Sequence, residues 1–359
     1  MTAVYAPTAL DGSGATDVTA SLNAFLKRVP DGPDPLHPQE VILTPGAVHR
    51  VDGILELTTR KNLRLVGDGV TLIREALSPY KDMPVLRITG GQGITVEALE
   101  IDGGHEGGGM GDDAYDPDLE GQHGIAVFGT LDLAIDHCKV HHTRADALYF
   151  TKLKIGPLSG GQASYRWCKN TVVRGGEFHH TGRSGVSVLG AECTLFCDGV
   201  EWWEIRRSTI NTEVNSAGFG GVRGLWVINA QVGSGRLNFM SSSGTGQVDD
   251  VHVLNSAFTR PIDVLISNGS PTHGTGRRTS YEFAHLISTA ECGNDSRAAI
   301  NAYRVDGLKV HHVTQPMGLR DAGKEMALVG AHGCTGVDVG PGIDLGSNPT
   351  AGPLLQWPR

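Results

Sequence analysis

Four acidic residues are the side chains best suited to glycosidic chemistry: Glu213, Asp146, Asp102 and Glu120. Hydrolysis of a glycosidic bond uses two carboxyl groups, about 5–5.5 Å apart for retention of configuration or about 6.5–9.5 Å apart for inversion. Neighbouring strands of a sheet lie about 4.8 Å apart, so acids one or two strands apart satisfy either geometry. We predict Glu213 and Asp146 as the catalytic pair, with Asp102 or Glu120 as substitutes.

Polar and aromatic residues that suit sugar hydroxyls and rings accompany these acids. Because side chains alternate across a strand, Leu148 and Phe150 should point inward and Tyr149 outward. The same alternation predicts an outward row of Tyr149, Ser187, Asn211 and Asn238, with Thr209 and Ala147 also outside. The side chains expected to bind substrate are Tyr149, Arg183, Asn211, Arg207, His123 and Asn238.

A lyase mechanism is an open alternative. It would use a basic residue, Lys152 or Lys154, and a cation such as calcium to neutralise a uronate carboxylate. The acidic residues at 112–118 could hold that cation, although their spacing is not that of an EF-hand.

Histidine pairs at 141–142, 179–180 and 311–312 suggest metal binding. Successive residues of a strand point to opposite faces, so such a pair should not chelate from one side. The six cysteines lack the spacing of a zinc site and are expected to be buried free thiols. We therefore predict no metal ion and no cofactor.

The elements that position these residues repeat along residues 131–270. Successive units begin at Leu131, Asn170, Cys193, Arg223 and Val248. From Asn170 onward their spacing of roughly 22–30 residues is typical of solenoids, and the period-2 alternation of all the units indicates strands. The predicted fold is all-β, a right-handed parallel β-helix solenoid with an N-terminal capping helix.

The expected organisation is a single domain in three parts: a lead-in with the capping helix (1–40), the β-helix (41–340) and a tail (341–359). The helix should be capped by Thr16 or Asp17 and run to about Arg28. Three insertions interrupt the coils, at 102–123, 152–167 and 269–281. Loops on a rigid scaffold commonly carry function. The neighbouring Trp202 and Trp203 should divide between the core and the surface.

Composition excludes several partners. A net charge of −9 without a basic run argues against nucleic-acid binding. No run of about 18 apolar residues is present, so we expect no membrane span. The N-terminus lacks the features of a signal peptide, which indicates use without general secretion or removal of the signal.

Several segments resemble right-handed β-helix proteins of actinobacteria and their phages, within the pectate-lyase-like superfamily. They are residues 17–26, VILTPG (41–46), KNLRLVGDGVTLI (61–73), LEGQHG (119–124), GRSGVSV (182–188) and RRSTINTEVN (206–215). The resemblance implies a carbohydrate-directed surface on one parallel sheet. It also implies that relatives carry an acid where this chain has Asn211, which favours binding without turnover.

Combined with this resemblance, the residues predict a phage tail protein of tailspike or minor-tail type. The leading function is hydrolysis of a bacterial envelope glycan. The alternatives are a non-catalytic receptor-binding or structural tail module, and a polysaccharide lyase or secreted bacterial enzyme. The expected partners are a polysaccharide and, in a homotrimer or a larger tail assembly, other protein chains. The expected location is the virion, or the extracellular space if a signal was removed.

Overall fold

The structure is a computed structural model. It describes residues 3–74, 82–105, 116–157, 163–189, 193–214, 222–241, 248–268, 280–292, 298–317, 326–346 and 351–357. The described residues are mostly β-strand. The chain divides into two compact units, unit 1 (1–187 and 204–207) and unit 2 (188–203 and 208–359). Each is described by itself.

Unit 1 contains α1, the one α-helix among the described residues, and the first strands. Their bounds are β1 Val4–Tyr5, β2 Ser13–Asp17, α1 Thr19–Arg28, β3 Gln39–Ile42, β4 Val48–Arg50, β5 Leu55–Thr58, β6 Lys61–Ile73, β7 Leu86–Thr89, β8 Gln92–Asp102, the 3-10 helix η2 Pro117–Leu119, β9 Ile125–Phe128, β10 Leu131–Asp136, β11 Lys139–Thr143, β12 Leu148–Thr151, β13 Leu153–Pro157, β14 Ala163–Arg166, β15 Lys169–Arg174, β16 Glu177–Thr181 and β17 Ser184–Val188, whose last residue belongs to unit 2.

Parallel pairing of β5, β7, β9 and β12 builds one wall of unit 1. Leu57, Ile88, Val127 and Phe150 are successive register partners along this wall, and each is 0% exposed. One strand therefore places its inward side chain directly above that of the previous coil. This stacking of apolar residues forms the core and confirms the alternation predicted for Leu148 and Phe150.

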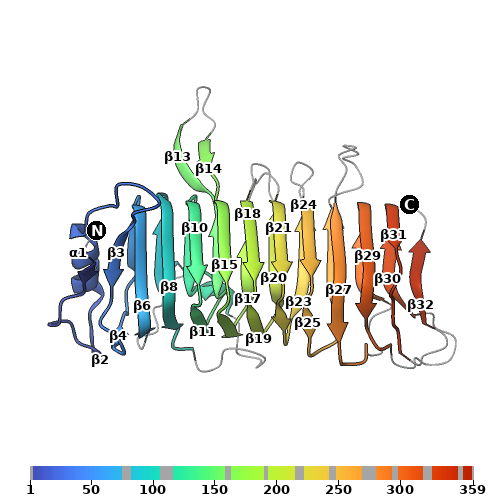
Figure 1. Cartoon of the computed structure of the whole chain (residues 1–359), viewed down its shortest axis with the longest axis horizontal. Coiled ribbons are helices and arrows are strands. Elements are labelled where there is room, and N and C mark those ends of the chain that lie inside the picture. Colours follow the sequence, from blue (N-terminus) through green and yellow to red (C-terminus); the bar gives the residue numbers. More distant parts are fainter. Residues whose placement is uncertain are drawn as a thin grey trace. The chain divides into compact units, whose positions relative to one another are not determined.

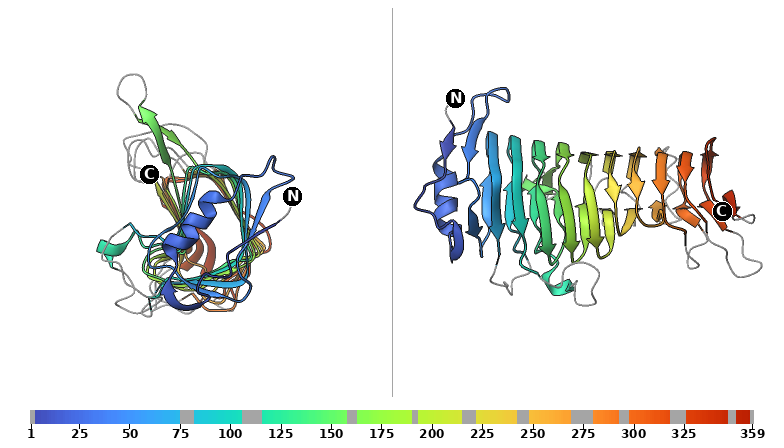
Figure 2. Two further views of the ribbon diagram at one scale, coloured as in Figure 1. Left: turned by 90° about the vertical axis from the view of Figure 1, so that its left-hand side faces the viewer. Right: turned by 60° about the horizontal axis from the view of Figure 1, so that its bottom comes forward.

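Helix α1 covers the N-terminal end of the unit 1 coils (Figure 2). Its Leu22 and Leu26 are buried, and Asn23 donates a hydrogen bond to the Ile54 carbonyl. The Asp17 carboxylate accepts the Thr19 N–H at 3.0 Å, which satisfies one of the free donors at the helix start. The predicted helix is thus confirmed, but its N-cap is Val18, which makes no side-chain cap hydrogen bond, so the prediction of Thr16 or Asp17 at that position is wrong. Strands β1 and β2, which the sequence analysis missed, precede it and pair with β3 and β4.

The hairpin of β13 and β14 interrupts the parallel pattern. Its strands pair antiparallel and project from the coils (Figure 1). Arg166 anchors its base by donating to the Gly129 carbonyl at 2.7 Å. Residues 158–162, which follow β13 in the sequence, lie outside the described residues.

Unit 2 repeats the same construction. Its strands are β18 Cys193–Asp198, β19 Glu201–Ile205 (whose last two residues belong to unit 1), β20 Ser208–Val214, β21 Val222–Ile228, β22 Gln231–Val232, β23 Arg236–Ser241, β24 Val248–Leu254, β25 Ala257–Phe258, β26 Val264–Asn268, β27 Tyr281–Ser288, β28 Ala298–Tyr303, β29 Asp306–Thr314, β30 Met326–His332, β31 Thr335–Val339 and β32 Ala351–Trp357. Along one wall, a parallel register stacks Ile210, Leu237, Val264, Ile300 and Val329.

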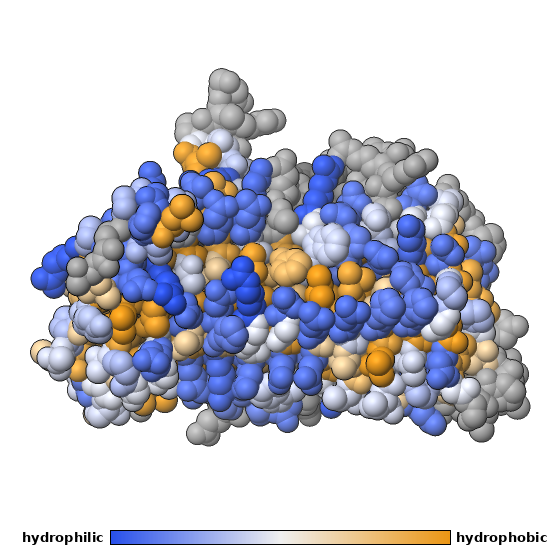
Figure 3. Space-filling model, viewed as in Figure 1, coloured by the Kyte–Doolittle hydropathy of each residue, from blue (hydrophilic) through white to orange (hydrophobic). Residues whose placement is uncertain are grey.

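Polar side chains cover much of the outer face of unit 1. Rows of hydrophilic residues with smaller apolar areas between them are visible on the face shown in Figure 3. Arg64, for example, contacts the carboxylates of Glu40 and Glu97 on the strands either side. Among the described residues, no helix has both the length and the apolar character that crossing a membrane requires.

Candidate functional site

The centre of the candidate site is a buried charged cluster in unit 1. The Asp146 side chain is 0% exposed. One of its oxygens accepts the Ser184 N–H at 3.0 Å, and the other lies 3.3 Å from both Arg183 Nη1 and His123 Nδ1. Burial alone would raise the pKa of the Asp146 carboxyl, but the hydrogen bond with His123 and the charge of Arg183 lower it below its usual value. Asp146 is therefore a carboxylate that positions Arg183 and His123.

Tyr149 lies over this cluster. Its ring stacks on His123 with 4.2 Å between centroids and 13° between planes. Burial, followed by the negative charge of Asp146, raises the pKa of Tyr149 to about 12, so its hydroxyl is neutral at physiological pH. Phe128 lies 6.3 Å from Tyr149, and the guanidinium of Arg87 lies over the Phe128 ring at 5.8 Å. Aromatic surface and hydrogen-bond donors thus occur together, as recognition of a sugar requires.

The predicted outward row is less accessible than expected. Tyr149 is half-buried, whereas Ser187 and Ala147 are 0% exposed. The prediction that these two residues face solvent is wrong, because alternation fixes the side of a strand but not what covers that side. In unit 1, the corners beside these strands are themselves buried: His123, Asp146 and Arg183 are each 8% exposed or less.

In unit 2, the predicted residues Asn211 and Asn238 are register partners on β20 and β23. Asn238 donates a hydrogen bond to Asn211 Oδ1 at 2.7 Å. Asn211 is 6% exposed and Thr209 is 0% exposed, so their expected full exposure is also wrong. The backbone of Glu213 belongs to β20, and its side chain lies outside the described residues.

The histidine pairs differ from the prediction. His142 has a φ of +50°, as has His180, so the backbone bends there instead of continuing as a regular strand. Both imidazoles of each pair therefore lie on one side, with Nδ1 atoms 2.6 Å apart in His141–His142 and in His179–His180. The expectation that neighbouring histidines cannot act together is wrong, because it assumed regular strand geometry. Asp102, at the end of β8, lies beside the first pair.

The other predicted residues differ in their exposure and surroundings. Glu120 is half-buried and follows η2, and Arg207 is exposed, with its N–H donating to the Arg183 carbonyl at 2.9 Å. Lys152 places its ammonium over the rings of Tyr165 and Trp167, at 4.1 and 5.4 Å. The acidic residues before Asp116, and the insertion at 269–279, lie outside the described residues.

Sequence reasoning missed three residues beside Tyr149: Asp82, Arg87 and Phe128. Arg87 Nη2 lies 3.1 Å from an Asp82 oxygen, and the Asp82 side chain is 72% exposed. Arg87 occupies the same register row as Tyr149, two coils earlier, with Ala126 between them. Arg87 occupies an outward position in the alternating segment LRIT (86–89), which pairs with β9, and this alternation could have identified it.

The prediction of buried free thiols is confirmed for Cys138, Cys168 and Cys197. Cys292 is also buried, whereas Cys334 is half-buried and departs from the prediction. Burial raises the pKa of Cys138 and Cys197 to about 12 and that of Cys168 to about 11. Trp202 and Trp203 divide as predicted, since Trp202 is 1% exposed and Trp203 is half-buried.

No protein-family model matches this chain, and neither does any curated protein. Solved structures are similar in fold. The surface adhesin PfbA of Streptococcus pneumoniae is 10% identical, with a TM-score of 0.61 over 98% of this chain and 93% of its own. Endo-xylogalacturonan hydrolase of Aspergillus tubingensis is 12% identical, with a TM-score of 0.59 over 98% and 95%. The family 28 exopolygalacturonase of Yersinia enterocolitica is 11% identical, with a TM-score of 0.51 over 96% and 76%. The chain therefore shares the fold of these three proteins.

Proposed function

We propose that this chain is a right-handed parallel β-helix solenoid that binds a polysaccharide on the outer surface of unit 1 around Tyr149. The observation that carries the proposal is the stack of Tyr149 on His123, which is itself held by the buried Asp146–Arg183 pair. A ring fixed in this way presents apolar surface to a sugar face without losing side-chain entropy on binding.

Arg87 supplies a polar group in the same register row as Tyr149, two coils earlier. Its guanidinium lies over the Phe128 ring, and Nη2 contacts the exposed Asp82 carboxylate. A guanidinium carries five N–H donors, which suit sugar hydroxyls. The adhesin and the two hydrolases named above support a carbohydrate-directed role by analogy of fold only.

The binding test compares two tyrosines that are each stacked on a histidine. Tyr149→Ala should weaken binding to the glycan that the wild-type chain selects from a panel of bacterial envelope polysaccharides. Loss of an aromatic anchor costs about 2 kcal/mol, or about 30-fold in Kd. Tyr303, in unit 2, stacks on His332 at 4.4 Å and 6°, so Tyr303→Ala is the matched control and should leave Kd unchanged. Equal effects of the two substitutions in calorimetry would contradict the proposed surface.

Hydrolysis is the second candidate function. Hydrolysis requires a carboxylate that the substrate can reach, and Asp82, which is 72% exposed and pairs with Arg87, is such a group. Asp146 is 0% exposed and is held by Ser184, Arg183 and His123. The catalytic pair Glu213 and Asp146 stays a prediction. Release of reducing ends by the wild-type chain, together with loss of that activity in Glu213→Gln or Asp146→Asn, would establish hydrolysis. Absorbance near 235 nm would instead indicate a lyase, and bound glycan without products would leave binding as the function.

The biological setting that we propose is a phage tail, where the chain would act on the envelope of a bacterial host as a homotrimer or with other tail proteins. The sequence resemblance to actinobacterial and phage β-helix proteins supports this setting. An extracellular bacterial protein is the alternative. The native molecular mass of the purified protein in solution distinguishes a trimer from a monomer.

A further inference from the structure

A compact set of metal-ligating atoms lies at one corner of the unit 1 coils. We call it the Asp102 corner, and it consists of Asp102, His141 and His142. The Nδ1 atoms of the two histidines are 2.6 Å apart. Asp102 Oδ1 lies 3.6 Å from His142 Nδ1 and 3.9 Å from His141 Nδ1. Ligands bonded to one Zn²⁺ at about 2.0–2.1 Å are about 3.3 Å apart in tetrahedral geometry. Metal binding would therefore replace the hydrogen bond between the two Nδ1 atoms, separating them by about 0.7 Å, and would draw the Asp102 oxygen closer by about 0.3–0.6 Å.

The backbone explains why three ligands converge here. Asp102 and His141 are register partners on β8 and β11, so the carboxylate lies one coil before the imidazole and on the same side. The left-handed conformation of His142, with φ +50°, brings the second imidazole to that side as well. The rings of His141 and His142 are nearly perpendicular, at 81°, which allows their lone pairs to point toward a common position.

A second carboxylate, that of Glu100, orients His141 for metal binding. His141 Nε2 lies 2.9 Å from Glu100 Oε1, and Glu100 also accepts from Thr71 and Lys139. Histidines that bind metals commonly donate their other N–H to a carboxylate in this way, which fixes the tautomer with a lone pair toward the metal.

We propose that the Asp102 corner binds a divalent transition-metal cation such as Zn²⁺ through Asp102 Oδ1, His141 Nδ1 and His142 Nδ1. The cation ties two successive coils together at the point where the chain leaves β8. The side chains of Asp102 and His142 are 25% and 31% exposed, so a fourth coordination position is open to water. This inference does not depend on the proposed polysaccharide surface.

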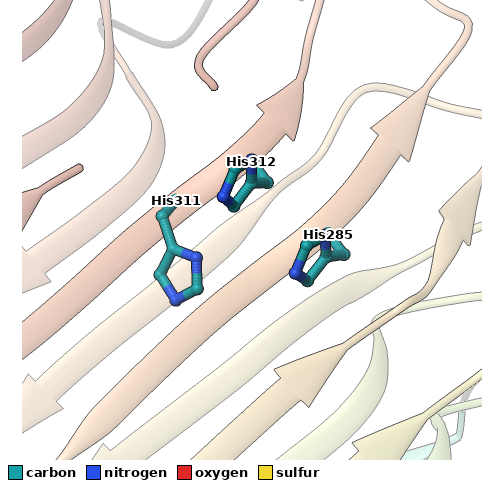
Figure 4. A group of neighbouring side chains, drawn as sticks. All are labelled: His285, His311 and His312. Atoms are coloured by element: carbon teal, nitrogen blue, oxygen red, sulfur yellow. The ribbon is translucent and has the colours of Figure 1, made fainter. Parts of the chain in front are cut away.

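Two other histidine groups fit a metal less well. His285, His311 and His312 form a cluster in unit 2 (Figure 4). The rings of His285 and His312 stack at 4.8 Å with 3° between their planes, so their in-plane lone pairs run parallel and do not converge. In the pair His179–His180, the carboxylate of Glu204 contacts Nε2 of His180, on the far side of the ring from Nδ1.

The test measures Zn²⁺ binding to the full chain by equilibrium dialysis. All variants carry His285→Ala and His312→Ala, which remove the unit 2 cluster. Asp102→Asn and His142→Asn delete one ligand each, and Glu100→Gln alters the group behind His141. Substitution of such supporting groups typically costs 10–100-fold in metal affinity, so Glu100→Gln should weaken Zn²⁺ binding about 10-fold or more. Loss of a ligand, in Asp102→Asn or His142→Asn, should weaken Zn²⁺ binding at least about 100-fold.

His180→Asn is the matched control, because His180 has the same φ as His142 and the same neighbour contact one coil later. Asparagine tolerates this backbone conformation, so both substitutions should preserve the fold. The proposal predicts one Zn²⁺ per chain in the background variant and an unchanged affinity in His180→Asn.

Absence of bound Zn²⁺ in the background, or equal affinity in all variants, would overturn the proposal. So would an equal loss in His142→Asn and His180→Asn. X-ray absorption of the Zn²⁺-loaded background chain provides a second measurement that needs no ligand variant. Two imidazoles and at least one oxygen around zinc are expected, and coordination without imidazole would refute the site.

Discussion

The buried carboxylate of Asp146 provides the sharpest test of how the candidate site is held together. Asp146→Asn removes its charge but keeps its size and an oxygen that can still accept the Ser184 N–H. Arg183, which is 8% exposed, would then lose its anionic partner inside the protein. Removing one partner of a buried ion pair costs about 3–5 kcal/mol, and because one hydrogen bond survives we expect about 3 kcal/mol.

A second Asp–Arg pair in unit 1 is the control. Arg174 Nη1 lies 3.3 Å from Asp136, the same separation as in the Arg183–Asp146 pair, but the Arg174 side chain is 54% exposed. Exposed pairs contribute about 0–1 kcal/mol, so Asp136→Asn should change stability little. Unfolding in urea, followed by tryptophan fluorescence, measures both variants against the wild-type chain. Equal losses of unfolding free energy would refute the reasoning, because burial would then make no difference.

The same variant predicts a pH dependence. The pKa of Asp146 is lower in the folded chain than in the unfolded chain. Its contribution to stability is therefore fully present above the unfolded-state value of about 4 and is lost as pH falls through the folded-state value. The stability gap between wild type and Asp146→Asn should be constant from pH 7 to about pH 5 and shrink below about pH 4. A gap that stays constant to the lowest pH at which both chains fold would contradict this assignment.

Two further predictions concern the core. Trp202→Ala removes a side chain that is 1% exposed and should cost about 3–5 kcal/mol, whereas Trp203→Ala, at a half-buried position, should cost about 1 kcal/mol in the same urea assay. Equal costs would show that the assigned strand faces are wrong. The thiols of Cys138, Cys168 and Cys197, with pKa values raised by burial to about 12, 11 and 12, should react with a disulfide reagent at pH 8 at least about a hundredfold more slowly in the native chain than in urea. Fast native reaction would contradict their burial.

Local sequence signals predicted much of the fold. Alternation over residues 131–270 identified strands and inward positions such as Leu148 and Phe150, because period-2 patterning follows directly from strand geometry. The helix ending at Arg28 was also recognisable from its amphipathic pattern. The hairpin β13–β14 was recognised only as an insertion at 152–167, since its pairing is antiparallel and lies outside the repeat.

The candidate site depended on tertiary structure to a greater degree. Residue types and strand alternation identified Asp146, Tyr149, His123 and Arg183 as candidates and predicted the side of the strand on which Tyr149 lies. Only the folded chain decided that Asp146 is enclosed, because its partners Arg183 and His123 lie 37 and 23 residues away. The left-handed bend at His142 likewise places two neighbouring imidazoles on one side. Such contacts arise from the register between coils and from single bent residues, and neither is visible in the local alternation of apolar and polar side chains.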